Sequence, residues 1–338
     1  MNFDFTDDQQ AIKRTARDFL ADRLKPERWR EFAESGAYDD SVWGEMAELG
    51  WPGIHLGEDS GGQGLGAVEL AILMEELGYA LTPSPFFATA SASLVIAHAG
   101  SDAQRERWLP RLASGEAAGT VGLVTDGVAP MVPDADRADV VVLVDGLSGM
   151  IVASGAAEIT EQPTIDSTRR FSRVRASDGE PLEGELMPAL DRIEVALAAE
   201  LVGVAQRAME MAVAYAKERE QFDRPIGAYQ AVSHRLAGML WDTEEARSLT
   251  YFAAWAADAE PGSLPLAASM AKARASDAAS SVTNAALQVF GGIGFTWEHD
   301  LHFLLKRATV GARMLGSPSR HRERVASLVG LGAGGATR

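Results

Sequence analysis

The chain has 338 residues, of which 46% are hydrophobic and 23% are charged, and its formal net charge is −17. This composition is typical of a globular protein with two or three packed parts, and the negative charge argues against nucleic acid or an anionic membrane surface as a partner. The absence of cysteine excludes disulfides, thiolate chemistry and cysteine-ligated zinc or iron–sulfur clusters.

Two further patterns exclude membrane and metal functions. No apolar run approaches the roughly 18 residues of a membrane span. The acidic start MNFDFTDDQQ has neither the basic nor the apolar region of a signal peptide. We therefore expect a cytoplasmic protein without a membrane partner. His299 and His302 lie three residues apart, but no third ligand is near them, so no metal site is predicted.

Residues 1–116 are predicted to form an N-terminal helical domain. Thr6 is a candidate N-cap for the first helix, and Pro110 is expected to kink or divide the last one. The glycine-rich loop GEDSGGQGLG precedes one of the helices. From apolar periodicity, the helices are expected at about 7–24, 39–49, 67–79, 85–98 and 102–114.

Residues 117–186 are predicted to form a small central β domain. Short β-branched runs such as GTVGLV and ADVVVLVDG are separated by Gly, Asp and Pro. This texture is typical of a small antiparallel sheet.

Residues 187–330 are predicted to form a C-terminal four-helix bundle, followed by a flexible tail over 331–338. The fold class is therefore mainly α with a small β domain. The four helices are expected at about 189–221, 228–258, 264–290 and 298–314.

The first candidate binding motif, REQFDRPIG, follows the first long helix of the bundle. A guanidinium (Arg219), a carboxamide (Gln221) and an aromatic ring (Phe222) could together hold a pyrophosphate and stack on a flat ring. A capped turn between two helices is the alternative interpretation.

The second motif, QVFGGIG, begins at Gln288 and has three glycines in four residues. Each glycine inside a helix costs up to about 1 kcal/mol relative to alanine. One interpretation is a helix end, with a left-handed glycine and Phe295 packed back on the last turn. The other is that the phosphates of a ligand approach the backbone of Gly291 and Gly292.

Together, the two motifs, their spacing of roughly 69 residues and the small sheet before them resemble the acyl-CoA dehydrogenase family. The resemblance covers nearly the whole chain and includes GEDSGGQGLGAVELAILMEELG near the N-terminus. It implies FAD at a subunit interface and α,β-dehydrogenation of an acyl-CoA, as in fatty acid or steroid side-chain β-oxidation. It also implies a carboxylate base, hydride transfer to the flavin, and an electron-transfer flavoprotein as acceptor.

The resemblance assigns roles to individual residues. Arg219, Gln221 and Phe222 match family contacts to the flavin dinucleotide. Gln288, with Gly291 and Gly292, matches the segment that meets the pyrophosphate of a neighbouring subunit's FAD.

The catalytic base departs from the family pattern. The two usual positions of the glutamate are occupied by Leu315 and Ile193. Glu194 is adjacent to Ile193, but one residue along a helix turns a side chain by about 100°. Glu200 lies about two turns farther on, and its alternative role is a polar interface residue or the partner of an arginine such as Arg207.

The β domain departs as well, because its length of about 65 residues is roughly half of what the family usually has. The family's flavin-side motif is replaced by VTDGVAPMVPDADRAD, in which Thr125 is the residue that remains. A Trp-Ile-Thr-like strand that lies against the flavin is missing.

These losses lead to one main hypothesis and two alternatives. The chain is interpreted as the accessory subunit of a heteromeric, α₂β₂-like acyl-CoA dehydrogenase, sharing FAD with a catalytic paralogue. The first alternative is a self-sufficient homo-oligomer that uses Glu194 or Glu200 as its base. The second is a non-enzymatic module that binds acyl-CoA or a partner and has lost FAD.

Overall fold

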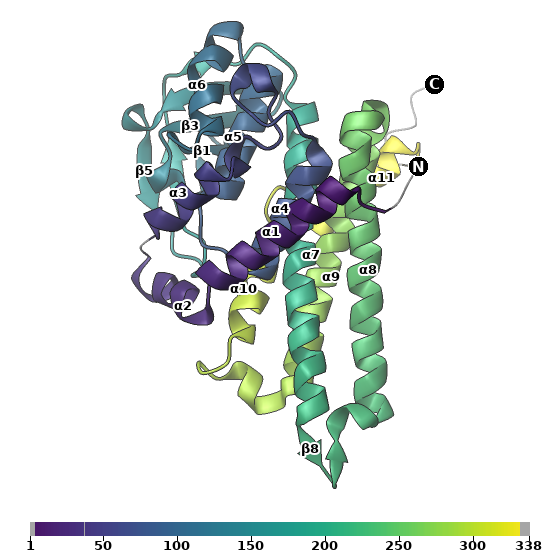
Figure 1. Cartoon of the computed structure of the whole chain (residues 1–338). Coiled ribbons are helices and arrows are strands. Elements are labelled where there is room, and N and C mark those ends of the chain that lie inside the picture. The colour runs from purple at the N-terminus through teal and green to yellow at the C-terminus, as the bar shows by residue number, and fades with distance from the viewer. Residues whose placement is uncertain (1–3, 37, 332–338) are drawn as a thin grey trace.

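The N-terminal helices and the strands lie beside one half of a bundle of long helices, whose other half projects away from them (Figure 1). This computed structural model describes residues 4–36 and 38–331. Most of the tail predicted over 331–338 therefore lies outside the described residues. The predicted class, mainly helical with a small β region and a C-terminal bundle, is confirmed.

Six helices form the N-terminal part. Thr6 caps the first as predicted, because its hydroxyl accepts a hydrogen bond from the backbone of Gln9 while the Gln9 side chain bonds back. The second helix was not predicted; it starts at Pro26 and ends at Gly36, whose φ is +69°. The sixth continues through Pro110, so the division expected there is wrong. Their bounds are α1 Asp7–Arg23, α2 Pro26–Ser35, α3 Asp40–Glu48, α4 Ala67–Tyr79, α5 Phe86–Ala99 and α6 Asp102–Ala113.

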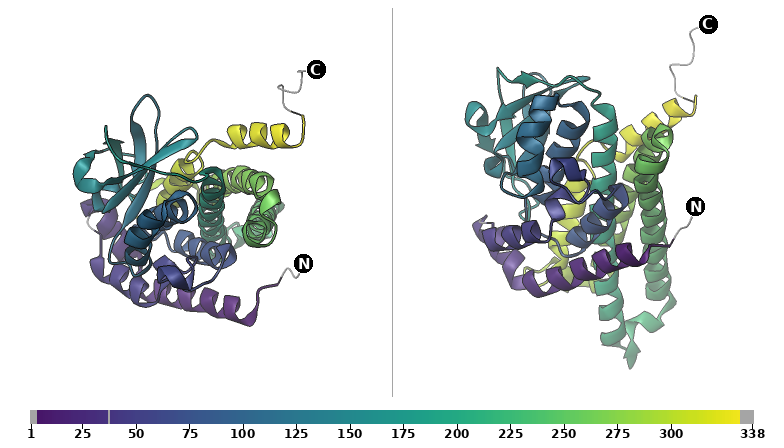
Figure 2. Two further views of the ribbon diagram at one scale, coloured as in Figure 1. Left: turned by 90° about the horizontal axis from the view of Figure 1, so that it is seen from above. Right: turned by 45° about the horizontal axis from the view of Figure 1, so that its top comes forward.

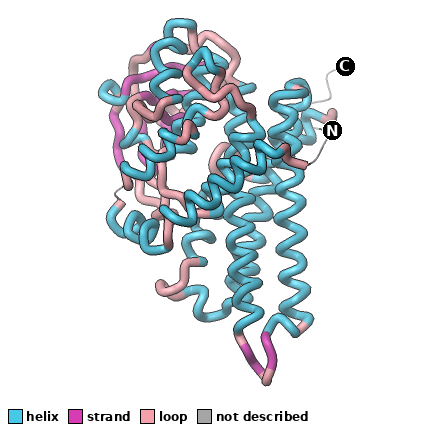
Figure 3. Tube along the Cα trace, viewed as in Figure 1, coloured by secondary structure: helices cyan, strands magenta, loops and turns pink. Residues whose placement is uncertain are grey.

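The strands of the β region form two small sheets (Figure 3). One has the order β1-β3-β4-β7 and the other β2-β6-β5. Pairing within them is antiparallel as predicted, except that β1 pairs with β3 in parallel. The bounds are β1 Gly119–Leu123, β2 Ala129–Pro133, β3 Val140–Asp145, β4 Ser148–Ala153, β5 Glu158–Glu161, β6 Phe171–Arg175 and β7 Glu180–Pro181.

Strand β3 is a continuous run of apolar residues because both of its faces are buried. Val140, Val142 and Val144 belong to the main hydrophobic core. Val141 and Leu143 belong to a second core between the sheets. Because successive side chains point to opposite faces, a strand buried on both faces has no polar side.

The bundle consists of three long helices and one shorter helix. The first ends three residues earlier than predicted, because Arg219 is extended and starts a hairpin that forms the far tip of the bundle (Figure 3). An additional helix, α11, lies beside the top of the bundle (Figure 2). The bounds are α7 Met187–Glu218, β8 Glu220–Gln221, β9 Arg224–Pro225, α8 Gln230–Ala259, α9 Leu264–Phe290, α10 Leu301–Gly311 and α11 Pro318–Leu328.

Helices α4 and α7 cross with their backbones in contact. A Cβ on Gly203 would lie 1.9 Å from the Glu75 carbonyl oxygen, and one on Gly78 would lie 2.1 Å from that of Glu200. Only glycine allows this approach. The crossing fixes α7 against the N-terminal part and so fixes the position of the glutamates on both helices.

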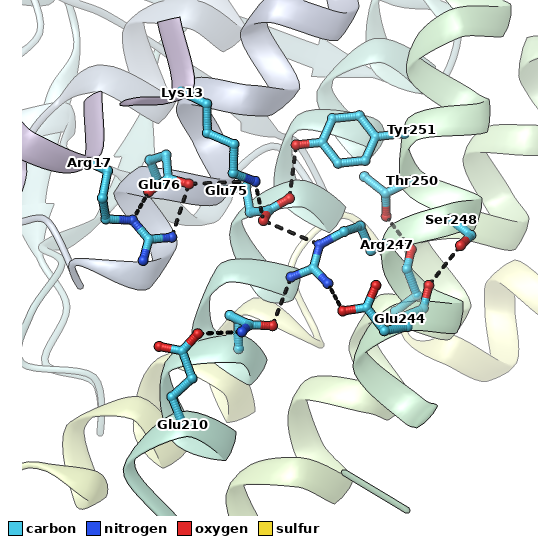
Figure 4. A network of polar contacts seen from close by, with 12 residues as sticks. Lys13, Arg17, Glu75, Glu76, Glu210, Glu244, Arg247, Ser248, Thr250 and Tyr251 are labelled. Carbon is cyan, nitrogen blue, oxygen red and sulfur yellow. Dashed lines mark hydrogen bonds and ion pairs between the residues drawn. The ribbon is translucent and has the colours of Figure 1, made fainter. Parts of the chain in front are cut away.

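A polar network reinforces the same junction (Figure 4). The buried carboxylate of Glu75 on α4 accepts from Lys13 of α1 at 2.9 Å and from Tyr251 of α8 at 2.8 Å. Arg247 of α8 lies 3.3 Å from the same carboxylate, and Glu76 is held by Arg17. The N-terminal part is thus tied to the bundle by buried charges that are paired. Within residues 4–36 and 38–331, no helix has the length and apolarity needed to cross a membrane.

Candidate functional site

Two neighbouring cavities lie between the β region and the N-terminal half of α7. The larger has a volume of about 550 Å³ and includes Glu194 in its wall. The smaller has a volume of about 300 Å³ and includes Ile193. Adjacent residues of α7 therefore face the two cavities separately. The walls have in common Leu123, Thr125, Leu315 and Arg320.

Glu194 is the carboxylate of this region. Its side chain is largely buried, and one oxygen lies 3.3 Å from Nη1 of Arg324, which also pairs with Asp191. Burial raises the pKa of Glu194 to about 8, although the Arg324 guanidinium acts in the opposite direction. The group therefore holds a proton at neutral pH and can exchange it close to that range.

His321, on α11, lies against Glu194. Its Nε2 is 3.1 Å from the Leu315 carbonyl oxygen, which can only accept, so Nε2 carries the proton. Nδ1 then has a bare lone pair; it has no hydrogen-bond partner among the described residues and lies 3.7 Å from the Glu194 carboxylate. Two acceptors face each other unless Glu194 is protonated. Burial also lowers the pKa of His321 to about 4.

Lys272, on α9, supports the segment that contains Leu315. It is fully buried, donates to the Ser276 hydroxyl at 2.9 Å and contacts the Ala312 carbonyl oxygen at 3.4 Å. Burial lowers the pKa of this lysine to about 8. Neither Lys272 nor His321 was predicted, because their contacts with Ala312 and Glu194 join parts of the chain that are far apart in the sequence.

Glu200, the second candidate base, lies outside the walls of both cavities. Its carboxylate is 2.6 Å from Nη2 of Arg169 and 2.8 Å from Nη1 of Arg307. Glu200 is therefore paired with arginine, as its alternative role predicted, but the partners are Arg169 and Arg307 and not Arg207. Burial alone would raise the pKa of Glu200, but the two guanidinium groups outweigh it and hold this pKa below its ordinary value. Such a carboxylate suits a structural anchor and is a poor proton acceptor.

The first binding motif lies at the far tip of the bundle, and its side chains are exposed. Arg219 follows α7, Gln221 lies in the hairpin, and Phe222 is 88% exposed. The Tyr229 hydroxyl donates to the Gln221 carbonyl oxygen at 2.9 Å and holds the turn.

The second motif lies at the C-terminal end of α9. Gly291 is left-handed, with φ +65°, and ends the helix as one interpretation predicted. Phe295 is 73% exposed, so its expected packing on the last turn is wrong. A Cβ on Gly291 or Gly292 would meet no described atom within 4 Å, so packing inside this chain does not explain the choice of glycine there. Gln288 beside them is exposed.

The predicted site residues therefore form two groups that are far apart in one chain. Glu194 lies near the start of α7 and Arg219 follows its end, 25 residues later. At 1.5 Å per residue this separation is about 37 Å. We call Glu194 and the cavity walls around it the cavity group. The bundle-tip group consists of Arg219, Gln221, Phe222, Gln288, Gly291 and Gly292. The two groups cannot act on the same small reactive centre within a single chain.

No group of three or more His, Asp or Glu residues converges as a metal site in the described part of the chain. His299 instead packs on the ring of Phe290, and His302 lies beside Trp297.

The protonation of Glu194 gives a stability prediction. The folded protein binds the proton more tightly than the unfolded chain, so this stabilisation is complete below about pH 4.5 and is lost as pH rises through about 8. Glu194→Gln imitates the protonated acid. We expect it to match the natural chain at pH 5 and to exceed its free energy of unfolding by about 1–3 kcal/mol at pH 8.5.

Urea unfolding at the two pH values measures this difference, with Glu323→Gln, an exposed change on α11, as the control. If Glu194→Gln has no higher free energy of unfolding than the natural chain at pH 8.5, ionisation of the Glu194 carboxylate costs the folded protein little free energy.

Comparison with known proteins adds the following findings. The family model "Acyl-CoA dehydrogenase, N-terminal domain" matches residues 6–116, and "Acyl-CoA dehydrogenase, C-terminal domain" matches residues 186–329. The chain is 36% identical to acyl-CoA dehydrogenase IpdE2 of Mycobacterium tuberculosis, over 96% of this chain and 98% of that protein.

Two solved structures are similar along almost the full length. One is the Tcur3481-Tcur3483 steroid ACAD in its G363A variant, with 26% identity, a TM-score of 0.87, and coverage of 95% of this chain and 97% of that one. The other is butyryl-CoA dehydrogenase of Megasphaera elsdenii, with 25% identity, a TM-score of 0.85, and coverage of 97% and 100%.

Proposed function

The chain belongs to the acyl-CoA dehydrogenase family, and we propose that it is the accessory subunit of a heteromeric, FAD-dependent enzyme that dehydrogenates an acyl-CoA at its α and β carbons. In this role the tip of its bundle completes the cofactor site of a catalytic paralogue. The observation that carries the proposal is the open glycine surface at Gly291 and Gly292, which follows the C-terminal end of α9 and lies outside the walls of the chain's own cavities.

The exposed residues at the bundle tip fit a dinucleotide. The guanidinium of Arg219 and the carboxamides of Gln221 and Gln288 would hold the phosphates and the polar groups near them. The open face at Gly291 and Gly292 lets backbone N–H groups approach a phosphate without a side chain between them. FAD, when bound, supplies the acceptor for the hydride that leaves the β carbon.

The chain's own cavities favour a partner as the catalytic subunit. Leu315 and Ile193, which have no titratable group, line them at the usual positions of the base. Thr125 is the remnant of the flavin-side motif in their walls. The similarity to a steroid acyl-CoA dehydrogenase whose name joins two components supports a heteromer, and supports a steroid-derived acyl thioester as substrate. We propose an electron-transfer flavoprotein as the acceptor.

Glu194 favours a second candidate, the self-sufficient homo-oligomer. It faces a cavity of about 550 Å³, and its pKa of about 8 suits a general base near neutral pH. In that case Glu194 would remove the α proton, with Nδ1 of His321 positioned to receive a hydrogen bond from the acid that forms. Glu200 is not a second candidate base for the homo-oligomer, because it is paired with two arginines and lines neither cavity.

The test is the flavin content of the protein, measured by absorption, after purification alone and after co-purification with a paralogue. We expect a colourless chain alone and bound flavin only in the mixed assembly. One flavin per chain in the isolated protein, reduced by an acyl-CoA, would contradict the accessory role and turn attention to Glu194. Absence of flavin in every assembly would leave a non-enzymatic binding module.

A further inference from the structure

A third cavity lies away from both groups described above, where α1, α2, α4, α7 and α10 meet. Its volume is about 190 Å³, which is comparable with roughly six molecules of liquid water. It is separated from the larger cavities because no wall residue is shared with them. The wall is formed by Arg17, Leu20, Ala21, Leu24, Lys25, Trp29, Glu76, Tyr79, Ala80, Leu81, Arg207, Met211, Asp300 and Leu304.

Most of this wall is apolar. Leu20, Leu24 and Trp29 come from one side, and Leu81 and Leu304 from the other; all five are at most 8% exposed. A small hydrocarbon group would therefore find a preformed apolar surface on several sides.

Two cations in the polar part of the wall, Arg207 and Lys25, have no ion pair among the described residues. Arg17 is neutralised by Glu76, to which it makes a two-bond contact (Figure 4), and Asp300 is neutralised by Arg30 from outside the cavity. Half-buried Arg207 forms one hydrogen bond, to the Tyr79 hydroxyl at 3.2 Å, and has no ion pair within the described residues. Lys25, exposed at the rim, likewise has no ion pair there.

The nearest carboxylate on the same helix is hydrogen-bonded to neutral groups and forms no ion pair with Arg207 within the described residues. Glu210 lies three residues after Arg207, but it accepts from the Tyr79 hydroxyl at 2.5 Å and from Gln206. The Tyr79 ring lies between the two guanidinium groups, with Arg17 at 3.6 Å and Arg207 at 5.2 Å from its centroid. Tyr79 thus fixes Arg207 at the cavity while leaving the other N–H donors of its guanidinium available.

We propose that this cavity binds a short-chain monocarboxylate, with the carboxylate on Arg207 and Lys25 and the hydrocarbon chain among the leucines and Trp29. A carboxylate matches the planar N–H donors of arginine and would give Arg207 and Lys25 a direct ion-pair partner. The volume limits the chain to a few carbons and is too small for coenzyme A. The site requires no flavin, so the proposal is independent of the accessory role.

Titration calorimetry of the full-length protein with pentanoate tests the site. We expect saturable binding of one pentanoate per chain, and at least about tenfold weaker binding to Arg207→Gln, since a charge-assisted pair is lost. Arg207→Lys keeps the positive charge but not the planar donors, so it should recover only part of the affinity lost in Arg207→Gln. Arg175→Gln, which removes an exposed cation on β6, is the matched control and should bind as the natural chain does.

Two further probes separate the parts of the proposal. Pentanol tests the hydrocarbon alone, and inorganic phosphate tests the charge alone; both should bind far more weakly than pentanoate. Lys25→Gln, a change at an exposed position, gives a second variant if Arg207→Gln does not fold, and it should weaken binding severalfold. The proposal is overturned if pentanoate does not bind, if pentanol or phosphate binds equally well, or if Lys25→Gln and Arg207→Gln leave the affinity unchanged.

Discussion

Replacing Arg307 with methionine is expected to lower the free energy of unfolding by about 4 kcal/mol, because it removes the cationic partner of buried Asp166 and leaves Glu200 with Arg169 alone. Arg307 of α10 is 1% exposed and donates to Glu200 at 2.8 Å and to Asp166 at 2.7 Å. It also donates to the backbone and side chain of Thr168. The apolar side chain fills much of the same space but offers none of these hydrogen bonds.

Urea unfolding of the variant at pH 7 measures the effect. Arg322→Met is the matched control, since Arg322 forms an exposed ion pair with Asp277 at 2.6 Å and should cost at most about 1 kcal/mol. Comparable losses in the two variants would show that the buried network contributes no more than a surface pair.

The expected loss also bears on the role of Glu200. Its carboxylate joins α7 to Arg307 of α10 and to Arg169, which lies between β5 and β6. The network therefore fixes the connection between β5 and β6 against α7 and α10 of the bundle. A structural role of this kind accounts for a buried glutamate that lines neither of these cavities.

Sequence reasoning was most effective where the signal is local. The Thr6 cap, the helix end at Gly291 and the C-terminal bundle follow from spacing and residue type over short distances. The parallel pairing of β1 with β3 could not be read in this way, because short β-branched runs do not specify their neighbours.

The candidate site was harder to predict for a physical reason. The partners of Glu200 lie 31 and 107 residues away in the chain, so spacing along α7 could suggest only a nearby arginine such as Arg207. Likewise, the environment of Glu194 depends on His321 and Arg324, more than 120 residues later. The sequence also did not show that the two bundle-tip motifs are exposed in a single chain, although the family resemblance implied that they contact another subunit.

Replacing Gly292 with leucine is expected to reduce the flavin content of the assembled enzyme about tenfold or more while leaving the chain folded. A Cβ at this position meets no described atom within 4 Å, and the residue does not require a left-handed backbone, unlike Gly291. A leucine there would occupy the space through which a phosphate reaches the backbone N–H groups. Losing even one such charge-assisted bond costs about 1.5–3 kcal/mol, which is about tenfold or more in affinity.

Flavin absorbance per assembly measures the effect, and thermal unfolding checks that the fold is retained. Gly262→Leu is the matched control, because Gly262 is also exposed with open space around it but lies between α8 and α9 at the opposite end of the bundle. Thr125→Trp, which narrows the chain's own larger cavities, separates the two functional readings. The accessory role predicts full flavin content in Thr125→Trp and loss in Gly292→Leu, whereas a self-sufficient homo-oligomer predicts loss in both. Equal flavin retention in the Gly292 and Gly262 variants would remove the bundle tip from the cofactor site.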